Sequence, residues 1–171
     1  KVVKKIKTIK ANVTFDSKYC ADYKPLMDHL ESGKGTIALK ANMGTGKTYA
    51  YADAVRAIEG SIGILSFRIS LALKYKKDFP GFVCYTDQKE KAITTERWIC
   101  QLDSLHRIPH TTVLKSLGID EVSQVRRHMT ADTYMRNSNY TNNRNSLLRL
   151  MRTAEQVVIM DANLSARDLA W

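Results

Sequence analysis

Cysteine and proline are scarce in this sequence, with three residues of each among 171. Cys20, Cys84 and Cys100 are odd in number and widely spaced, and none belongs to a C-x-x-C pair. A disulfide framework and a zinc site are therefore both disfavoured. A reducing environment is the natural one for such thiols, so we expect an intracellular protein of unspecified compartment.

Long apolar runs are also missing. No stretch approaches the length that crosses a bilayer, and no apolar segment follows the basic start of the chain, as it would in a secretory signal. We therefore expect no membrane partner. Hydrophobic residues make up 44% of the chain and charged residues 26%, which is typical of a globular protein. The length suits one ordinary domain, which we place at residues 13–171.

Acidic residues are few beside the basic ones, 17 against 27, and the formal net charge is +10. A basic domain of this size is expected to attract polyanions, of which nucleic acid is the commonest. Residues 1–12 read as a basic arm or linker. A second basic group in the last third predicts either a phosphate-binding surface or ordinary solvated helix faces: Arg126, Arg127, Arg136, Arg144, Arg149 and Arg152.

Strand and helix patterns alternate along the chain. The runs read as strands are apolar at consecutive positions, which favours strands covered on both faces of a parallel sheet. The pattern predicts an α/β domain with a mostly parallel sheet and helices on both faces. Expected strands are 36–40, 62–67, 82–86, 98–102, 112–119 and 156–161, and expected helices are 22–33, 47–59 and 70–79.

The segment from Arg136 to Asn145 breaks this rhythm. It is rich in asparagine and poor in apolar residues. Such a segment can bury little surface, so we expect an exposed loop near residues 136–146.

The segment from Ala41 to Thr48 matches the phosphate-binding pattern G-x-x-x-x-G-K-[ST], with alanine in the first position. Gly44 and Gly46 allow a tight turn that directs backbone N–H groups toward an anion, at the positive end of the following helix. Lys47 can reach the β- and γ-phosphates of ATP, and the Thr48 hydroxyl can hold Mg²⁺. The predicted nucleotide-binding residues are Met43, Gly44, Thr45, Gly46, Lys47 and Thr48; the alternative is a glycine-rich turn without a ligand.

A phosphate-binding loop of this kind needs an acidic partner on a neighbouring strand. Asp120 is the candidate for Mg²⁺ binding, directly or through water, and Glu121 the candidate for activating the attacking water. The strand before them is interrupted by Lys115, Ser116 and Gly118. The alternative is a surface Asp-Glu pair at the start of a helix, favoured by the helix dipole.

Taken in order, five motifs resemble the first RecA-like motor domain of a superfamily 2 helicase. They are Ala41–Thr48, Ser66–Ala72, Gln101–His106, Asp120–Ser123 and Asp161–Leu164. Within that superfamily, the chain most resembles the helicase portion of herpesvirus origin-binding proteins and related replication proteins of large DNA viruses and plasmids. The features that support this branch are Met43–Thr48, the Asp103–Leu105 segment, and Asp-Ala-Asn-Leu at 161–164.

The resemblance implies further roles. Ser66 and Arg68, and Asp103 and Ser104, would contact a nucleic acid, most simply DNA with a single-stranded region. Asp161, Ala162 and Asn163 would couple hydrolysis to movement. A helicase of this class also needs a second RecA-like domain that supplies an arginine to the γ-phosphate. No second phosphate-binding loop is visible in this chain.

The leading hypothesis is an ATP-binding, Mg²⁺-dependent motor domain of a DNA helicase in replication initiation, with Lys47 and Glu121 as catalytic residues. The alternative is a regulatory module that binds nucleotide or DNA without hydrolysis. A different phosphate-loop enzyme is the third possibility, and the absence of an Asn-Lys-x-Asp signature weakens its GTPase version.

Overall fold

The computed structural model describes residues 11–170, so the predicted basic arm lies almost wholly outside the described residues. Six strands form: β1 (Gly35–Lys40), β2 (Ile62–Ser66), β3 (Val83–Cys84), β4 (Arg97–Gln101), β5 (Ser116–Asp120) and β6 (Gln156–Asp161). The α-helices are α1 (Lys24–Glu31), α2 (Lys47–Ala54), α3 (Ile69–Asp78), α4 (Val122–Met129), α5 (Asp132–Met135), α6 (Tyr140–Thr153) and α7 (Ala166–Leu169). Two short 3₁₀ helices are η1 (Cys20–Asp22) and η2 (Leu102–Arg107).

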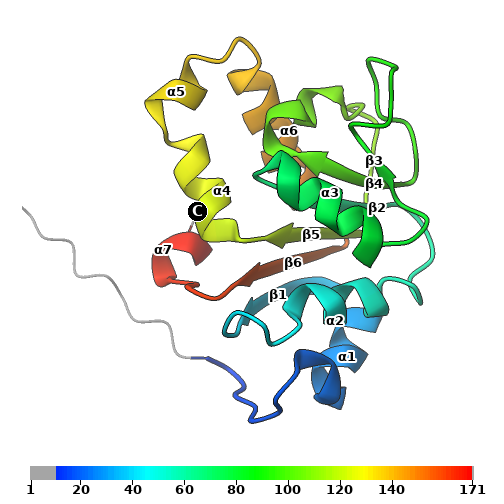
Figure 1. Cartoon of the computed structure of the whole chain (residues 1–171), viewed down its shortest axis with the longest axis vertical. Helices are drawn as coiled ribbons and strands as arrows, with labels where there is room; N and C mark the ends of the chain where they lie inside the picture. The colour runs from blue at the N-terminus through cyan, green and yellow to red at the C-terminus, as the bar shows by residue number, and fades with distance from the viewer. Residues whose placement is uncertain (1–10, 171) are drawn as a thin grey trace, which may run out of the picture.

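All neighbouring strands in the single sheet are parallel, in the order β1-β6-β5-β2-β4-β3. Strand β1, which precedes the predicted phosphate-binding loop, therefore lies at one edge of the sheet, and β6 and β5 separate it from β2 (Figure 1). Side chains of β2, β5 and β6 are buried at every position, whereas those of β1 alternate over its last four residues. The predicted α/β class with a mostly parallel sheet is confirmed.

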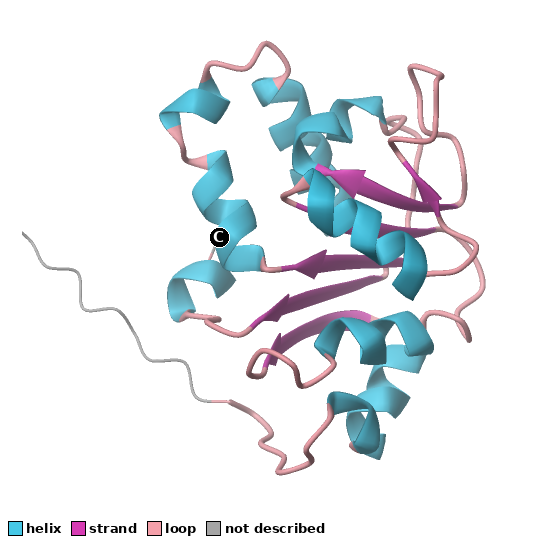
Figure 2. Ribbon diagram, viewed as in Figure 1, coloured by secondary structure: helices cyan, strands magenta, loops and turns pink. Residues whose placement is uncertain are grey.

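Helices cover both faces of the sheet. In Figure 2, α2 and α3 lie in front of the strands, and α6 lies behind them, where it packs against η2. This arrangement follows from right-handed crossovers. After β1 and β2 the chain moves toward the β3 edge of the sheet, and after β4 and β5 it moves toward the β1 edge. Connections of one hand that run in opposite directions lie on opposite faces of the sheet. Within residues 11–170, no helix combines the length and the apolar character that crossing a membrane requires.

Two interior glycines let large rings pack closely against the strands. A Cβ on Gly118 of β5 would lie 2.2 Å from the Tyr51 ring, and a Cβ on Gly63 of β2 would lie 2.4 Å from the Trp98 ring. Ser116 is also internal, because its hydroxyl is 2.8 Å from the Tyr51 hydroxyl and donates to Gln156 at 2.7 Å. Two of the residues that interrupt the fifth strand in sequence, Ser116 and Gly118, are thus partners of α2 and β6, and the third, Lys115, precedes β5.

Several predicted boundaries are corrected. The helix expected at 47–59 ends at Ala54, and turns continue to Ile58, where the carbonyls of Val55 and Ile58 accept hydrogen bonds from Arg97. The strand expected at 82–86 is only the pair Val83–Cys84, at the far edge of the sheet. The fifth strand begins at Ser116 rather than 112 and reaches Asp120.

The prediction of a loop at 136–146 is wrong over its second half. Residues 136–139 are a turn, but α6 begins at Tyr140 and includes the remaining asparagines. Asn143 is fully buried: its Oδ1 accepts from the backbone N–H of His106 at 2.7 Å, and its Nδ2 donates to the Asp103 carbonyl at 2.9 Å. Buried polar groups are normally hydrogen-bonded in this way, and composition alone does not reveal which asparagines find such partners.

Candidate functional site

A cleft of about 590 Å³ opens at the carboxyl ends of β1, β6, β5 and β2. This is where ligands bind in open parallel sheets. The loop before α2, the loop after β5 and the loop after β6 all border it. Among the predicted site residues, the structure brings Met43, Gly44, Gly46, Lys47, Thr48, Arg68, Asp120, Glu121, Asp161, Ala162 and Asn163 to this one cleft.

The loop between β1 and α2 has the backbone that the sequence predicts. Gly44 and Gly46 have φ of 78° and 73°, a left-handed conformation that other residues adopt at a cost. Gly46 is the N-cap of α2 and has no side chain to cover the first N–H groups, so these groups remain free for an anion. The Lys47 ammonium donates to the carbonyls of Ala41 at 2.6 Å and Asn42 at 2.9 Å and pairs with no carboxylate of the described residues.

Asp120 is a buried carboxylate, 7% exposed, at the end of β5. Its Oδ2 accepts hydrogen bonds from the Thr48 hydroxyl at 2.6 Å and from the Tyr75 hydroxyl at 2.7 Å. Its Oδ1 accepts from the backbone N–H of Glu121 at 2.9 Å. Burial, together with the charge of Asp120, raises the pKa of the Tyr75 phenol, so this hydroxyl is a donor throughout the physiological range.

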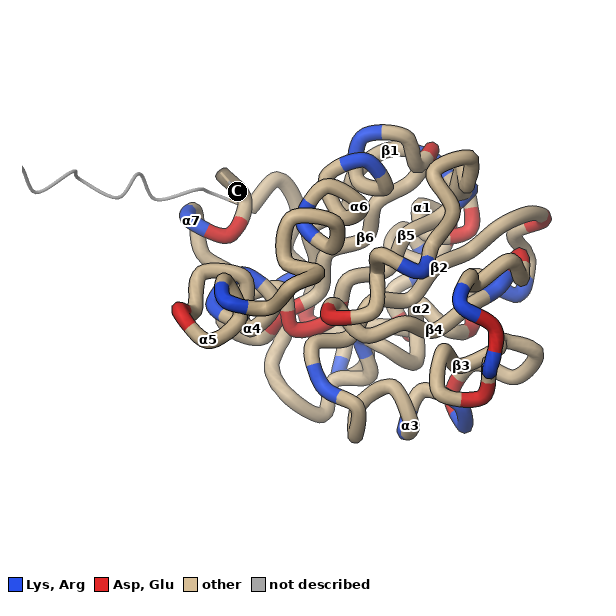
Figure 3. The backbone as a smooth tube through the Cα atoms, turned by 90° about the horizontal axis from the view of Figure 1, so that it is seen from above, with Lys and Arg blue, Asp and Glu red and all other residues tan. Residues whose placement is uncertain are grey.

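Glu121 is the one non-glycine residue with positive φ among the described residues, at φ 52° and ψ 49°. This conformation costs a residue with a Cβ about 1–2 kcal/mol, and it directs the chain from β5 into α4 beside the cleft. Burial raises the pKa of the Glu121 carboxyl, and the charges of Asp120 and Asp161 raise it further, whereas Arg68 and Lys47 oppose the shift. In Figure 3 acidic positions of the backbone gather beside α4.

Asp161 links the end of β6 to the start of α4. Its Oδ2 accepts from the backbone N–H of Ser123 at 2.8 Å, and its Oδ1 accepts from that of Asn163 at 2.7 Å. Farther along, Asp168 of α7 forms a buried ion pair with Arg126 of α4 at 2.7 Å. Two contacts therefore hold α4, which follows Glu121, against the segment that follows β6.

Four predicted residues do not line the cleft. Thr45 uses its hydroxyl on the Asn42 carbonyl at 2.8 Å, and its own carbonyl accepts from Cys20 at 2.9 Å. Ser66 is fully buried and donates to the Arg68 carbonyl. Asp103 lies 2.8 Å from Nε2 of His128, and neighbouring Ser104 is half-buried on η2 beyond the end of β4.

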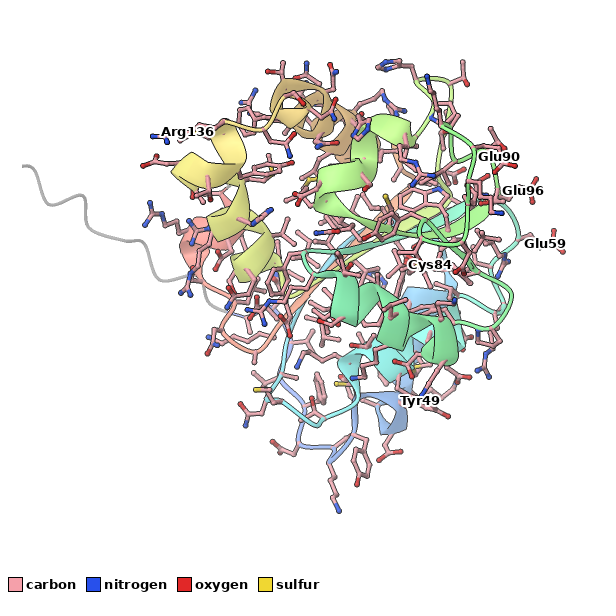
Figure 4. The ribbon with its side chains drawn as sticks, turned by 45° about the horizontal axis from the view of Figure 1, so that its top comes forward. Tyr49, Glu59, Cys84, Glu90, Glu96 and Arg136 are labelled. Atoms are coloured by element: carbon pink, nitrogen blue, oxygen red, sulfur yellow. The ribbon has the colours of Figure 1, made fainter. Side chains whose placement is uncertain are left out.

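The predicted arginine surface loses two of its members. Arg126 pairs with Asp168, and Arg149 donates to the carbonyls of Thr112 at 2.8 Å and Pro109 at 3.0 Å, so both hold the fold together. The remaining four are exposed: Arg127, Arg136, Arg144 and Arg152. In Figure 4, Arg136 lies at the outer edge of the molecule, beyond α5.

Sequence reasoning missed Tyr75 as a site residue and assigned no role to Ser123. Tyr75 occupies a buried position of an amphipathic helix, where an aromatic residue ordinarily means core. Nothing in sequence indicates that its hydroxyl reaches a strand 45 residues away. Ser123 acts through its backbone N–H, which leaves no signal in its residue type.

The donor set suits a nucleoside triphosphate with Mg²⁺. Free N–H groups at a helix start and an ammonium without a carboxylate partner fit phosphate, and a hydroxyl beside a carboxylate supplies the oxygen ligands that Mg²⁺ prefers. Residues 11–170 contain no group of three His, Cys, Asp or Glu side chains that could hold a metal ion. Mg²⁺ is commonly held by one or two carboxylates together with substrate phosphates and waters.

Comparison with known proteins identifies the family. Residues 1–169 match the family described as origin of replication binding protein. The chain belongs to this family. Relatives named replication origin-binding protein occur in human herpesvirus 7 (strain JI), 28% identical over 134 residues, and in varicella-zoster virus (strain Dumas), 29% identical over 139 residues. A relative in Acanthamoeba polyphaga mimivirus is 30% identical over 146 residues.

These alignments include most of the chain and little of the relatives. They cover 74%, 75% and 77% of this chain for the herpesvirus 7, varicella-zoster and mimivirus proteins, and 16%, 16% and 18% of those proteins respectively. The chain thus spans less than a fifth of each of these three relatives.

Proposed function

We propose that the chain is the ATP-binding and ATP-hydrolysing first motor domain of a superfamily 2 DNA helicase that acts in replication initiation. The observation that carries the proposal is the meeting of Lys47, Thr48, Asp120 and Glu121 at one cleft. Family membership supports the second part, because the herpesvirus relatives are named replication origin-binding proteins.

In this proposal the phosphates of ATP lie on the free N–H groups of the loop before α2. Lys47 exchanges its two carbonyl partners for the β- and γ-phosphates. Thr48 and Asp120 hold Mg²⁺, directly or through water. The bound cation supplies neutralisation of phosphate charge.

Glu121 would orient the attacking water toward the γ-phosphate and take its proton, as the new P–O bond forms and the bond to the β-phosphate oxygen breaks to release ADP. Its environment suits that task, because burial and two neighbouring carboxylates raise its pKa and so make the carboxylate a stronger base. Asp161, with Ala162 and Asn163, couples the state of the cleft to α4 through the Ser123 contact.

The partners in this proposal are DNA with a single-stranded region and a second RecA-like domain. Arg68, at the start of α3, and the four exposed arginines are the candidate phosphate contacts on DNA. The second domain supplies the arginine that stabilises charge on the transferred phosphate.

ATP turnover by the full-length protein, with and without single-stranded DNA, tests the proposal. Glu121→Gln should lower DNA-stimulated turnover about 10²- to 10⁴-fold while nucleotide still binds. Lys47→Ala should abolish nucleotide binding. Glu59→Gln and Lys34→Ala are matched controls, because both residues are exposed and neither lines the cleft; Glu59 points away from the molecule in Figure 4.

The outcomes separate the two functions. Turnover that is stimulated by DNA and lost in Glu121→Gln supports the motor. Nucleotide binding that needs Lys47, with no turnover in the wild type, identifies a non-hydrolysing regulatory module instead. If Lys47→Ala changes neither nucleotide binding nor ATP turnover, both proposed functions are overturned.

A further inference from the structure

The Tyr75 hydroxyl contributes a contact to the candidate metal site that neither the motif set nor the family description assigns. Tyr75 lies on α3, is 1% exposed and borders the cleft. It donates to Oδ2 of Asp120 at 2.7 Å, and this oxygen is also the acceptor for Thr48 at 2.6 Å.

These contacts fix the plane of the Asp120 carboxylate. Thr48 and Tyr75 occupy Oδ2, and the Glu121 N–H occupies one side of Oδ1 at 2.9 Å. Each carboxylate oxygen has two lone pairs, so one lone pair on Oδ1 remains for a cation or its water. Of these three donors, Thr48 belongs to the phosphate-binding loop motif and Glu121 to the Asp120–Ser123 motif. Tyr75 belongs to neither motif.

We propose that Tyr75 is a positioning residue for Mg²⁺: it holds Asp120 in the orientation that accepts the cation and makes the placement of α3 part of the metal site. The inference rests on the proposed nucleotide-binding function. Partners behind a ligating carboxylate tune metal affinity, and their loss typically weakens it 10- to 100-fold. Because α3 begins directly after Arg68, the same hydrogen bond ties the candidate DNA-contact segment to the cation.

The competing explanation is structural, since a buried tyrosine hydroxyl needs a partner and Asp120 could serve merely as that partner. Tyr51 provides a matched control for this explanation. It is equally buried, and its hydroxyl is 2.8 Å from Ser116 of the same strand, away from the cleft. Tyr51→Phe therefore removes the same kind of hydrogen bond without touching Asp120.

The experiment titrates MgCl₂ into the full-length protein bound to a fluorescent ADP derivative, for wild type, Tyr75→Phe and Tyr51→Phe. Tyr75→Phe should raise the half-saturating Mg²⁺ concentration about tenfold, and its affinity for the nucleotide in EDTA should match the wild type. Tyr51→Phe should titrate like the wild type. In an Asp120→Asn background, Tyr75→Phe should have no further effect on the half-saturating concentration.

Phenylalanine keeps the ring contact with Phe79, whose centroid lies 6.0 Å away, and circular dichroism checks that each variant folds. Equal Mg²⁺ titrations for wild type and Tyr75→Phe overturn the inference while leaving the proposed function intact. An equal shift in both tyrosine variants also overturns it, because the effect would then be general. Absence of nucleotide binding by the wild type contradicts the proposed function itself.

Discussion

The Thr48 hydroxyl donates a 2.6 Å hydrogen bond to Oδ2 of Asp120, across 72 residues of sequence. It joins the first turn of α2 to the carboxyl end of β5, although β6 lies between β5 and the P-loop strand β1 in the sheet. The start of α2 therefore reaches β5 across the one strand that separates β1 from it. Thr48 and Asp120 are the two residues that the sequence predicts to hold Mg²⁺, and binding of the cation stays a prediction.

Replacing Glu121 by glycine should stabilise the protein while it removes activity. The left-handed conformation of Glu121 costs about 1–2 kcal/mol, and glycine avoids that cost at an entropic penalty of about 0.5–1 kcal/mol. We expect Glu121→Gly to raise the free energy of unfolding by about 0.5–1 kcal/mol in urea denaturation and to abolish ATP turnover. Glu59→Gly, at an ordinary exposed position, should not be stabilising. A less stable Glu121→Gly protein would mean that the conformation carries no strain.

Much of this fold can be predicted from sequence, and the reason is visible in β6. All six of its positions are buried, and its four central residues, 157–160, form an apolar run between Gln156 and Asp161. Such runs identify central parallel strands, and the glycine–lysine–threonine turn identifies the edge where their ends meet. Five of the predicted site groups reach the cleft for that reason, since each lies at the carboxyl end of a strand or in the segment after it: Lys47, Arg68, Asp120, Glu121 and Asp161.

The rest depends on partners distant in sequence. Asn143 reads as a loop residue until η2 presents the His106 N–H and the Asp103 carbonyl to it. Asp103, for which the helicase resemblance implies a nucleic-acid contact, lies 2.8 Å from Nε2 of His128 on α4, a neighbour that sequence does not indicate; its nucleic-acid role stays a prediction. The residue type of a polar side chain does not reveal whether it is solvated or hydrogen-bonded to another part of the protein. Only the tertiary structure distinguishes these two environments.

The acidic limb of the pH–rate profile should respond to Arg68. A general base must be ionised, so turnover falls as the pH falls through the raised pKa of Glu121. Arg68→Gln removes a positive charge that lowers this pKa, so the acidic limb should move to higher pH. Lys74 also lines the cleft, but its charge does not contribute to the pKa shift of Glu121. Lys74→Gln makes the same change in net charge, so the acidic limb of this variant should stay at the wild-type pH. An unmoved limb in Arg68→Gln would exclude Glu121 as the titrating group.

Arg126→Met should destabilise the fold, because it leaves Asp168 buried without its cation. The pair is 14% and 2% exposed, and removing one partner of such a pair costs about 3–5 kcal/mol. Burial alone raises the pKa of Asp168, but hydrogen bonds from Ser165 and Arg126 hold it below the usual range. The pair therefore stabilises at neutral pH, and the loss should shrink as pH falls through that lowered pKa. Urea denaturation at neutral and at acidic pH measures the loss of stability and its dependence on pH. Lys24→Met, which breaks an exposed pair, should change little.

Gly118→Ala should be among the most damaging small substitutions in the sheet. The added Cβ would lie 2.2 Å from a ring carbon of Tyr51, which is fully buried and tied to Ser116, so neither side can yield easily. We expect a loss of about 3 kcal/mol in the free energy of unfolding, the upper part of the usual overpacking range. In a Tyr51→Leu background the same change should cost distinctly less, because the ring is gone. An equal cost in both backgrounds would show that Gly118 serves β5 for another reason.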